Sequence, residues 1–395
     1  MELRDRLTKI VRPLGALLLA AALPAGCAGS KATGDHQRIQ AASAAPGARS
    51  EAPAKPAPSK PPPVKLTVEL NGDLLIHSPV WETALQDGHG RYDFSPMLRE
   101  VAPYIKRADL AICHVETPMT PRPPTGYPIF NTPTQLAAAI RKAGWRMCDT
   151  ASNHSVDLGQ YGIDQTGRAL NRAGVLHTGS FGSRAAQNRT LMVTVKGVRV
   201  AFLAYTEMTN GIPLPHPWSV NIAHPSAVRR AARLARRRGA RVVIVNLHWG
   251  TEDVSQPSEF QLRTASALAR DPDITAIVGQ HVHVVQPIER VHGKLVVFGE
   301  GQLISNESAA CCPIQTEDGM LVFLHLAVAG NHSSVRSITY MPTWNRHPDY
   351  TVLPIGDALR RHQAPAGVLR DSYRRTTAVV GRIRHVVTPI PARLP

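Results

Sequence analysis

Apolar runs alternate with stretches of helical periodicity from Val64 onward, and this alternation predicts the fold. Strands are predicted in "VKLTVELNG", at 110–115, 147–151, in "GVRVAFLAYTE", and at 242–247, 274–278 and 294–298, with helices at 95–106, 133–143, 159–173, 226–238 and 258–269. "GMLVFLHLAVAG" and "VRSITYMP" predict a closing hairpin. Strands separated by helices are typical of parallel βαβ units. We therefore expect an α/β domain with a mostly parallel central sheet over 64–345, followed by a C-terminal extension, 346–395, to which the pattern assigns no role.

The first 63 residues lack this pattern and have the composition of an export signal and a tether. Basic residues precede the apolar run Leu14–Leu23, and the small-residue sequence "AGC" ends at Cys27, which predicts a signal peptide over 1–27. Cys27 resembles the lipidated cysteine of bacterial lipoproteins, although Pro24 stands where that signal usually has Leu, so cleavage without lipidation is the alternative. Residues 28–63, rich in Pro and Ala, predict a disordered tether. We expect an extracytoplasmic protein, anchored to the membrane through a lipid or secreted, with no nucleic-acid partner.

The chain is strongly basic, with 45 Lys and Arg against 29 Asp and Glu and a formal net charge of +16. Such a surface attracts polyanions, among them anionic wall polymers and polyglutamate. A GC-rich genome is an alternative origin of this composition, and the arginines of the helix at 226–238 are better explained as a solvated face. Cys113 and Cys148 lie in predicted strands, where buried thiols and one disulfide are both compatible with an oxidising compartment. The neighbouring Cys311 and Cys312 have no assignable role.

Candidate ligands for a metal follow five of the predicted strands. They are Asp73 in "NGDLL", Glu116 in "ADLAICHVE", Asn153 and His154 in "ASNHSVDLG", His248 in "NLHWG", and His281 and His283 in "GQHVH", which is expected to be an extended segment after Gly279. Because the carboxyl ends of parallel strands meet at one edge of a sheet, these side chains are expected to converge. A charge directly after so apolar a strand is costly to bury unless it is paired or binds a cation. Taken singly, Glu116 and His248 have structural explanations, but the whole set predicts a metal site.

The mixture of imidazole, carboxylate and amide ligands suits one or two divalent ions, with zinc, manganese and iron not distinguishable. His154 can pass protons near neutral pH, and Asp157 can either orient it or cap the next helix. Bound divalent ions activate water and polarise the bond under attack. Hydrolysis is the reaction that this combination favours.

The order Asp, Glu, Asn-His, His, His-x-His resembles the calcineurin-like metallophosphoesterase superfamily, and more closely its CapA branch, named for poly-gamma-glutamate capsule synthesis. The segments that carry the resemblance lie between Leu66 and Ile304. The resemblance implies a layered α/β/β/α sandwich and an exported or membrane-anchored protein that helps to make, release or anchor an anionic polymer, alongside membrane synthase or export partners. It also implies six metal ligands, Asp73, Glu116, Asn153, His248, His281 and His283, with Glu116 in the bridging position and His154 as general acid or base.

The chain departs from the superfamily pattern at several positions. Leu75 stands where the phosphatases usually have a histidine, so one metal would lack a ligand, as in CapA proteins generally. His114 replaces the usual Asn before the Glu, and Gln302, after Glu300, replaces the Asn of a late Gly-Asn-Phe motif. Residues expected around the ligands or in contact with substrate are Asp157, His114, Glu252, Glu300 and Gln302.

Two functions remain open. The first is a metal-dependent hydrolase or transferase that acts on a phosphoester or on the amide linkage of a polymer. The second is a non-catalytic, metal-containing protein that binds the polymer and serves as an accessory to a membrane synthase.

Overall fold

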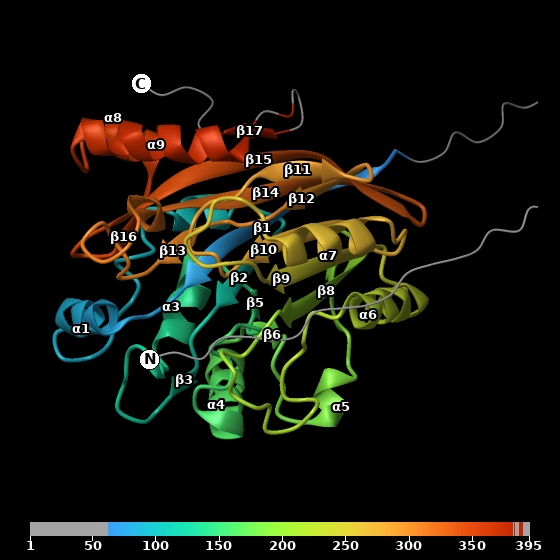
Figure 1. Ribbon diagram of the computed structural model, residues 1–395, viewed down its shortest axis with the longest axis horizontal. Helices are drawn as coiled ribbons and strands as arrows, with labels where there is room; N and C mark the ends of the chain where they lie inside the picture. Colours follow the sequence, from blue (N-terminus) through green and yellow to red (C-terminus); the bar gives the residue numbers. More distant parts are fainter. Residues whose placement is uncertain (1–61, 382, 384–386, 390–395) are drawn as a thin grey trace, which may run out of the picture. The chain divides into compact units, whose positions relative to one another are not determined.

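Two β-sheets pack against each other and carry helices on their outer sides in the computed structural model, which describes residues 62–381, 383 and 387–389 (Figure 1). The predicted signal peptide, Cys27 and all but the last two residues of the predicted tether lie outside the described residues. Within the described part of the chain, no helix combines the length and the apolar character needed to cross a membrane.

The first sheet has nine strands, in the order β16-β15-β14-β1-β2-β5-β6, with β13 beside β1 and β17 beside β15. Its strands are β1 (Val64–Leu74), β2 (Leu110–Val115), β5 (Met147–Asp149), β6 (Leu176–Thr178), β13 (Gln302–Ile304), β14 (Asp318–Ala329), β15 (His332–Arg346), β16 (Thr351–Pro354) and β17 (Val387–Pro389). The run β1-β2-β5-β6 is parallel. β14 and β15 form the antiparallel hairpin that the sequence predicts.

The second sheet has six strands, in the order β11-β12-β10-β9-β8-β7. Its strands are β7 (Leu191–Val195), β8 (Val198–Thr206), β9 (Val242–His248), β10 (Ala276–Gln280), β11 (Ile288–Val291) and β12 (Lys294–Val297). The four central strands are parallel and the two outer ones antiparallel to their neighbours. Within β9, Val242 and Ile244 join the core between the sheets, whereas Val243 and Val245 pack in the helix-covered core. Burial on both faces explains why this strand is a continuous apolar run.

Helices cover the outer face of each sheet. On the first sheet, apolar side chains from α1 (Ser78–Asp87), α2 (Ala102–Ile105), α3 (Leu136–Ala143) and α4 (Gly159–Arg172) join one core cluster with β1 and β2. On the second sheet, α6 (Pro225–Arg237) and α7 (Glu259–Ala269) pack against β8, β9 and β10, and a short α5 (Arg184–Gln187) precedes β7. The predicted α/β/β/α layering is confirmed.

Two predicted helices differ from the observed ones. The helix expected over 95–106 is reduced to α2, because residues 95–101 form turns up to its start. Pro103 lacks an N–H and is tolerated only in the first turn of a helix, which fixes where α2 can begin. The helix expected from 133 begins at Leu136, since Thr132–Pro133 forms β4 and pairs with β3 (Met119–Thr120).

The C-terminal segment belongs to the same folded unit as the strands. β16 pairs with β15, and α8 (Ile355–Arg360) and α9 (Ala366–Val380) pack over Trp344 and Leu353. Arg375 of α9 forms an ion pair of 2.7 Å with the buried Asp318 at the start of β14. In Figure 1 these red helices lie beside β15, at the end of the molecule away from α4.

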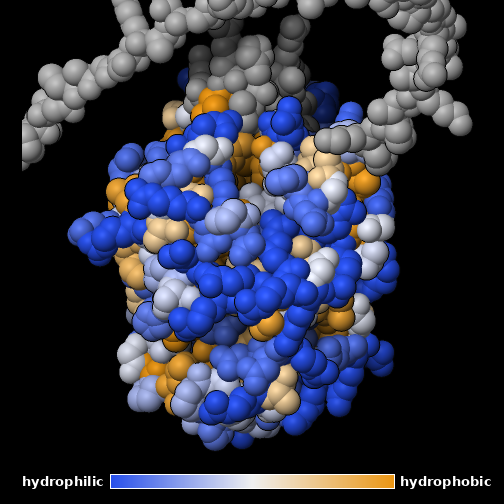
Figure 2. Space-filling model, turned by 90° about the vertical axis from the view of Figure 1, so that its right-hand side faces the viewer, coloured by the Kyte–Doolittle hydropathy of each residue, from blue (hydrophilic) through white to orange (hydrophobic). Residues whose placement is uncertain are grey.

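The structure resolves two alternatives that the sequence left open. Cys113 of β2 and Cys148 of β5 stand opposite each other in the sheet and form a disulfide. The arginines of α6 lie mainly on an exposed face, while Val228, Ala232 and Ala235 are buried. The side of the molecule on which α6 lies is predominantly hydrophilic, with small apolar patches between the polar side chains (Figure 2). This arrangement agrees with a solvated arginine face.

Candidate metal centre

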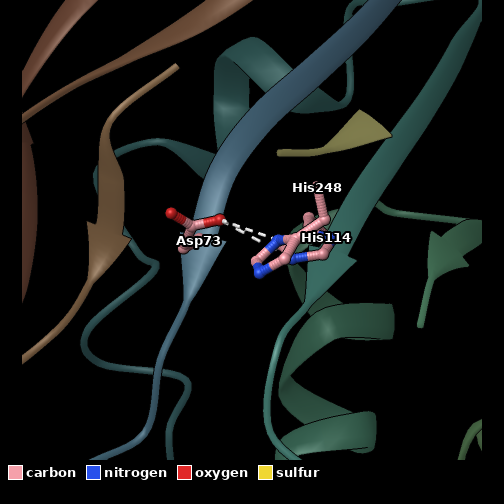
Figure 3. Close-up of side chains that lie close together, drawn as sticks. All are labelled: Asp73, His114 and His248. Atoms are coloured by element: carbon pink, nitrogen blue, oxygen red, sulfur yellow. Dashed lines mark ion pairs between the residues drawn. The ribbon is translucent and has the colours of Figure 1, made fainter. Parts of the chain in front are cut away.

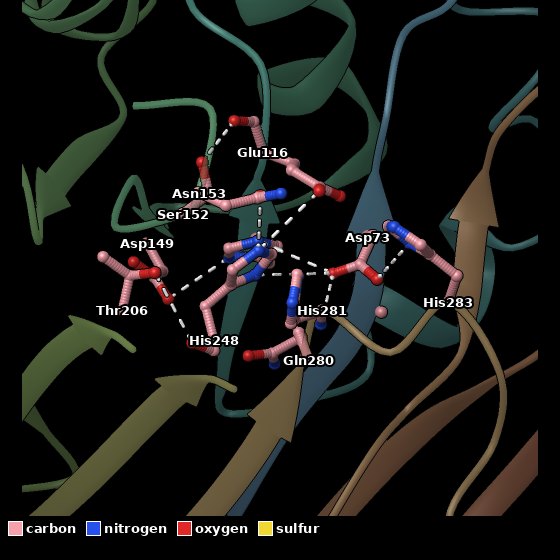
Figure 4. A network of polar contacts seen from close by, with 12 residues as sticks. Asp73, Glu116, Asp149, Ser152, Asn153, Thr206, His248, Gln280, His281 and His283 are labelled. Carbon is pink, nitrogen blue, oxygen red and sulfur yellow. Dashed lines mark hydrogen bonds and ion pairs between the residues drawn. The ribbon is translucent and has the colours of Figure 1, made fainter. Parts of the chain in front are cut away.

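The predicted ligands converge at the carboxyl ends of strands from both sheets (Figure 4). Asp73 is in β1, Glu116 follows β2, Asn153 follows β5, His248 ends β9, and His281 and His283 follow β10. All six side chains are buried. Residues far apart in the sequence are therefore brought into one cluster by the parallel strands, as predicted.

Asp73 owes its position to a close approach between β1 and β13. The backbone N–H of Asp73 donates to the carbonyl of Gly301 at 3.1 Å. A Cβ atom at Gly72 would lie 1.8 Å from the Gly301 carbonyl oxygen, so only glycine fits there. Gly301 itself has a φ of 71°, which favours glycine. These two glycines let β1 carry its carboxylate into the space between the sheets.

The Asp73 carboxylate lies at the centre of the cluster. Its Oδ2 is 3.4 Å from His283 Nδ1. Its Oδ1 is 3.6 Å from His114 Nε2, 4.0 Å from His248 Nδ1, and accepts a hydrogen bond of 3.3 Å from the His281 backbone N–H. One carboxylate thus faces imidazoles from three different strand ends.

His248 links the Asp73 side of the cluster to Glu116 and Asn153. Its Nε2 donates to Asn153 Oδ1 at 2.9 Å and lies 3.7 Å from Glu116 Oε1. Asn153 Nδ2 donates to Glu252 Oε1 at 3.5 Å. The Glu252 side chain is 53% exposed, so it lies where the cluster meets solvent.

The histidine pair after β10 reaches the cluster through a bent backbone. The sequence interpretation placed His281 and His283 in an extended segment, and this was wrong: β10 ends at Gln280, and the two residues have φ angles of 95° and 60°. Positive φ is uncommon for a residue with a Cβ, and strained backbone of this kind clusters at functional sites. The two rings lie 5.9 Å apart, and both residues contact Asp73, His283 through its ring Nδ1 and His281 through its backbone N–H.

Several buried polar atoms of the cluster have no hydrogen-bond partner among the described residues. They are Asp73 Oδ2, both Glu116 carboxylate oxygens, and Nδ1 of His248, His281 and His283. Leaving such atoms unpaired in the interior costs about 1–3 kcal/mol each. Ligand atoms of Glu116, His281 and His283 lie within 4.8 Å of one another, and a second group contains Asp73 and His248. The residues present therefore fit a divalent cation, and the donor set suits zinc, manganese or iron alike.

The pKa shifts show how unfavourable the cluster is without a cation. Burial raises the pKa of Glu116 well above its ordinary value, and the Asp73 charge raises it further. Burial lowers the pKa of His281 to about 3 and that of His248 well below its usual range, with neighbouring histidines adding to both shifts. Burial also opposes a charge on His283, but Glu116 and Asp73 outweigh it and raise the pKa of His283.

Metal uptake is expected to release protons. Glu116 and His283, whose pKa values are raised, hold protons that a cation must displace, whereas His248 and His281, whose pKa values are lowered, are already neutral. Apparent affinity should therefore rise with pH until it reaches the raised pKa values of these two groups, which for His283 lie above the ordinary histidine value of about 6.5. Calorimetric titration in two buffers of different ionisation enthalpy should show about one to two protons released per ion. Affinity independent of pH, without proton release, would contradict this assignment.

His154 is held as a proton-transfer group beside the cluster. Its Nδ1 lies 2.9 Å from Asp157 Oδ2, which also accepts from the Phe130 backbone N–H at 2.8 Å. Because a carboxylate accepts only, His154 Nδ1 carries the hydrogen and Nε2 is left to exchange a proton. Phe130 packs edge-on against the ring, with centroids 4.7 Å apart. Of the two roles expected for Asp157, the structure shows orientation of His154.

The other predicted residues also lie around the cluster. Glu252 Oε1 is 3.9 Å from His283 Nε2, and Gln302 stands opposite Asp73 in the β1–β13 pairing. Glu300 is buried beneath the cluster and accepts from Gln280 Nε2 at 2.7 Å. Leu75 stands where the phosphatases of the superfamily are expected to have a histidine. It is buried and offers no ligand atom.

Sequence reasoning missed several polar residues that support the site. Asp149, Asn246 and Gln280 are buried and hydrogen-bonded to one another or to His114. A polar residue inside or at the end of an apolar strand was the signal that could have found them. His77, just beyond β1, accepts from the Asn306 N–H at 3.2 Å, and burial lowers the pKa of His77 to about 4. Its position after the first strand was a comparable signal.

Two packed sheets with a buried histidine and carboxylate cluster at their strand ends define a layered α/β protein with a candidate metal centre. The chain belongs to the bacterial capsule synthesis protein family PGA_cap, whose family model matches residues 67–307. That range includes every predicted ligand.

Curated relatives agree with this assignment. The chain is 26% identical over 273 residues to the capsule biosynthesis protein CapA of Bacillus anthracis, covering 66% of this chain and 64% of that one, which is less than two thirds of the relative's length. It is 23% identical over 332 residues to the PGA biosynthesis protein CapA of Bacillus subtilis, covering 80% and 77%. A probable polyglutamine synthesis accessory protein of Mycobacterium tuberculosis is 25% identical over 218 residues, covering 50% and 56%. The expected CapA relationship is confirmed.

Solved structures with a similar arrangement include a phosphatase from Mycoplasma pneumoniae, with a TM-score of 0.47 and 14% identity over 73% of this chain and 96% of that one. The calcineurin-like phosphoesterase YfkN of Bacillus subtilis has a TM-score of 0.46 and 13% identity, covering 79% and 100%.

Proposed function

We propose that this protein is an exported CapA-like protein that takes part in the synthesis, release or anchoring of an anionic capsule polymer, poly-gamma-glutamate or a similar polyanion, as a metal-dependent hydrolase or transferase. Membership of the capsule synthesis family, together with the biosynthetic roles named for the CapA relatives, supports an anionic capsule polymer as the target. The observation that carries the catalytic part is the buried, unpaired ligand set beside the oriented His154–Asp157 pair.

The residues divide the chemistry between them. A divalent cation bound by the cluster would activate water and polarise the bond under attack. Asp73 and Glu116 supply the negative charge that balances such a cation, and His248, His281 and His283 supply neutral nitrogen donors. His154 Nε2 takes a proton from the attacking group or returns one to the leaving group, while Asp157 keeps the ring in the required tautomer.

Incubating the metal-loaded full chain with poly-gamma-glutamate tests this proposal. New amino termini and a fall in polymer size are expected if the amide linkage is cleaved, and a parallel assay with a phosphodiester tests the other bond type. Turnover should stop on chelation and return when metal is added back. Metal-loaded protein that turns over neither substrate would reject the enzymatic proposal.

The second candidate, a polymer-binding accessory without turnover, is favoured by a basic cavity next to the cluster's strands. The cavity, about 650 Å³, is lined from α4, β6, α5 and β7 and carries Arg168 and Arg189, with Asp164 4.0 Å from Arg168. Arg168 and Arg189 are both exposed. Polyglutamate binding that weakens steeply with salt, together with an absence of turnover, would support this candidate. Polyglutamate binding that does not depend on salt would argue against a role of these arginines in holding the polymer.

Cys27→Ser is expected to move the protein from the membrane fraction to the soluble extracytoplasmic fraction. The physical reason is that a lipid chain on Cys27 would supply the attachment. Fractionation of cells expressing the wild type and the variant measures this, with a labelled fatty acid as a second readout. Equal membrane retention of both forms, or a wild type without label, would contradict lipidation and leave plain secretion.

A further inference from the structure

His114 is a buried histidine of β2 that the ligand set expected for the family does not include. It stands opposite Asp73 of β1 and Asp149 of β5 in the sheet. Its side chain is 1% exposed, and its ring stacks on His248 with centroids 4.8 Å apart. Asp73, His114 and His248 lie close together, with ion-pair contacts running from the carboxylate to the two rings (Figure 3).

The partner of His114 Nδ1 determines which ring nitrogen is free. Nδ1 lies 3.2 Å from Asp149 Oδ2, and a carboxylate accepts only, so Nδ1 donates. Nε2 is then a bare acceptor, 3.6 Å from Asp73 Oδ1, with no hydrogen-bond partner within the described residues. A histidine that donates one N–H to a carboxylate and presents the other nitrogen to an anionic cluster has the arrangement of a metal-ligating imidazole.

Asp149 is itself held firmly. Its Oδ1 accepts from the Ala151 N–H at 2.7 Å, and its Oδ2 accepts from Asn246 Nδ2. Asn246 Oδ1 accepts in turn from Gln280 Nε2 at 3.0 Å. Each of Asp149, Asn246 and Gln280 comes from a different strand and is buried. These hydrogen bonds hold the Asp149 carboxylate in place, and Asp149 in turn fixes the orientation of the His114 ring.

We propose that His114 Nε2 is a ligand of the metal ion on the Asp73 side of the cluster, with Asp149 as its positioning residue. His114 would supply from β2 the nitrogen donor that Leu75 cannot supply from β1. Ligand atoms of Asp73, His114 and His248 lie within 4.8 Å of one another, and all three residues are buried. The inference rests on the metal site of the proposed function, and it makes that side of the cluster a donor set of two nitrogens and a carboxylate.

A structural alternative exists for the same geometry. A doubly protonated His114 would lie as an imidazolium between the Asp73 and Asp149 carboxylates, at 3.6 Å and 3.2 Å. A cation and an imidazolium cannot share this space, because the two positive charges would repel at close range. The two assignments therefore predict opposite effects of His114 on metal affinity: a ligand strengthens binding, whereas an imidazolium weakens it.

Co²⁺ binding by the full chain tests the proposal, with visible absorption reporting the ligands and chelator competition reporting affinity. The variants are His114→Asn, which has the residue usual in the family, Asp149→Asn, and the control His325→Asn. His325 bonds Thr67 and Thr339 at the opposite end of β1. We expect about a 100-fold loss of affinity and an altered spectrum for His114→Asn, about a 10- to 100-fold loss for Asp149→Asn, and no change for the control.

The outcomes separate this inference from the proposed function. Wild-type protein that binds no Co²⁺ would reject the metal site and the inference together. Wild-type affinity and spectrum in both His114→Asn and Asp149→Asn, or tighter binding in His114→Asn, would reject the inference alone and favour the imidazolium. Should His114→Asn fail to fold, as judged by its melting curve, Asp149→Asn decides, because it leaves the imidazole in place.

Discussion

Replacing His154 by alanine is expected to lower turnover by the metal-loaded protein by about 10²- to 10⁴-fold, the usual contribution of a positioned general acid or base. The ring lies beside the cluster, its Nδ1 is committed to Asp157, and its Nε2 is the atom that can exchange a proton. The variant should keep its metal, because His154 belongs to neither group of clustered ligand atoms. The measurement is the turnover number at saturating substrate, with metal content determined on the same sample.

Asp157→Asn provides the matched test of orientation. The amide can still accept through its oxygen but no longer stabilises a positive ring, so turnover should fall less than in His154→Ala and the pH profile should shift. His325→Ala, at the far end of β1, should leave turnover unchanged. Full activity in His154→Ala would contradict the catalytic role of His154. Loss of metal in that variant would indicate that His154 is a metal ligand instead.

Replacing Asp73 by asparagine should lower metal affinity by about 100-fold or more, which exceeds the effect of removing a residue that only supports a ligand. Asp73 lies within 4.0 Å of ring nitrogens of His114, His248 and His283, so it carries the negative charge at the centre of the cluster. The substitution keeps the shape of the side chain and removes its charge. Chelator competition followed by elemental analysis measures the loss.

Asp109→Asn is the matched control for this variant. Asp109 pairs with Lys196 at 2.7 Å and has a partly exposed side chain. The melting curves of the metal-free proteins should show both variants folded. Unchanged metal affinity in Asp73→Asn would mean that Asp73 does not bind the metal, and it would contradict the assigned metal centre.

The strand-end residues were predictable because two simple rules apply to them. A charged or imidazole side chain directly after a buried apolar strand needs a partner, and parallel strands bring their carboxyl ends together. Asp73, Glu116 and His248 follow both rules, and the structure places them in one cluster. The alternation of strands and helices predicted the mostly parallel α/β character of the domain, whereas the α/β/β/α layering was implied by the family resemblance.

Other features depend on contacts between distant segments, which no local pattern contains. The supporting role of Asp149 requires the pairing of β5 with β2, and that of Asn246 requires the second sheet to face the first. The bent backbone at His281 and His283 was missed because His-x-His alone is equally compatible with an extended segment. The helix expected over 95–106 failed for a local reason, since the restriction that Pro103 places on helix starts was overlooked.

Anomalous X-ray diffraction from crystals of the metal-loaded protein shows directly whether the cluster binds metal. We expect an anomalous peak enclosed by the cluster, within about 2.0–2.3 Å of ligand atoms from at least three of Asp73, His114, Glu116, His248, His281 and His283. A peak bound only elsewhere on the protein, or an empty cluster in crystals grown with excess Zn²⁺ or Mn²⁺ near neutral pH, would contradict it.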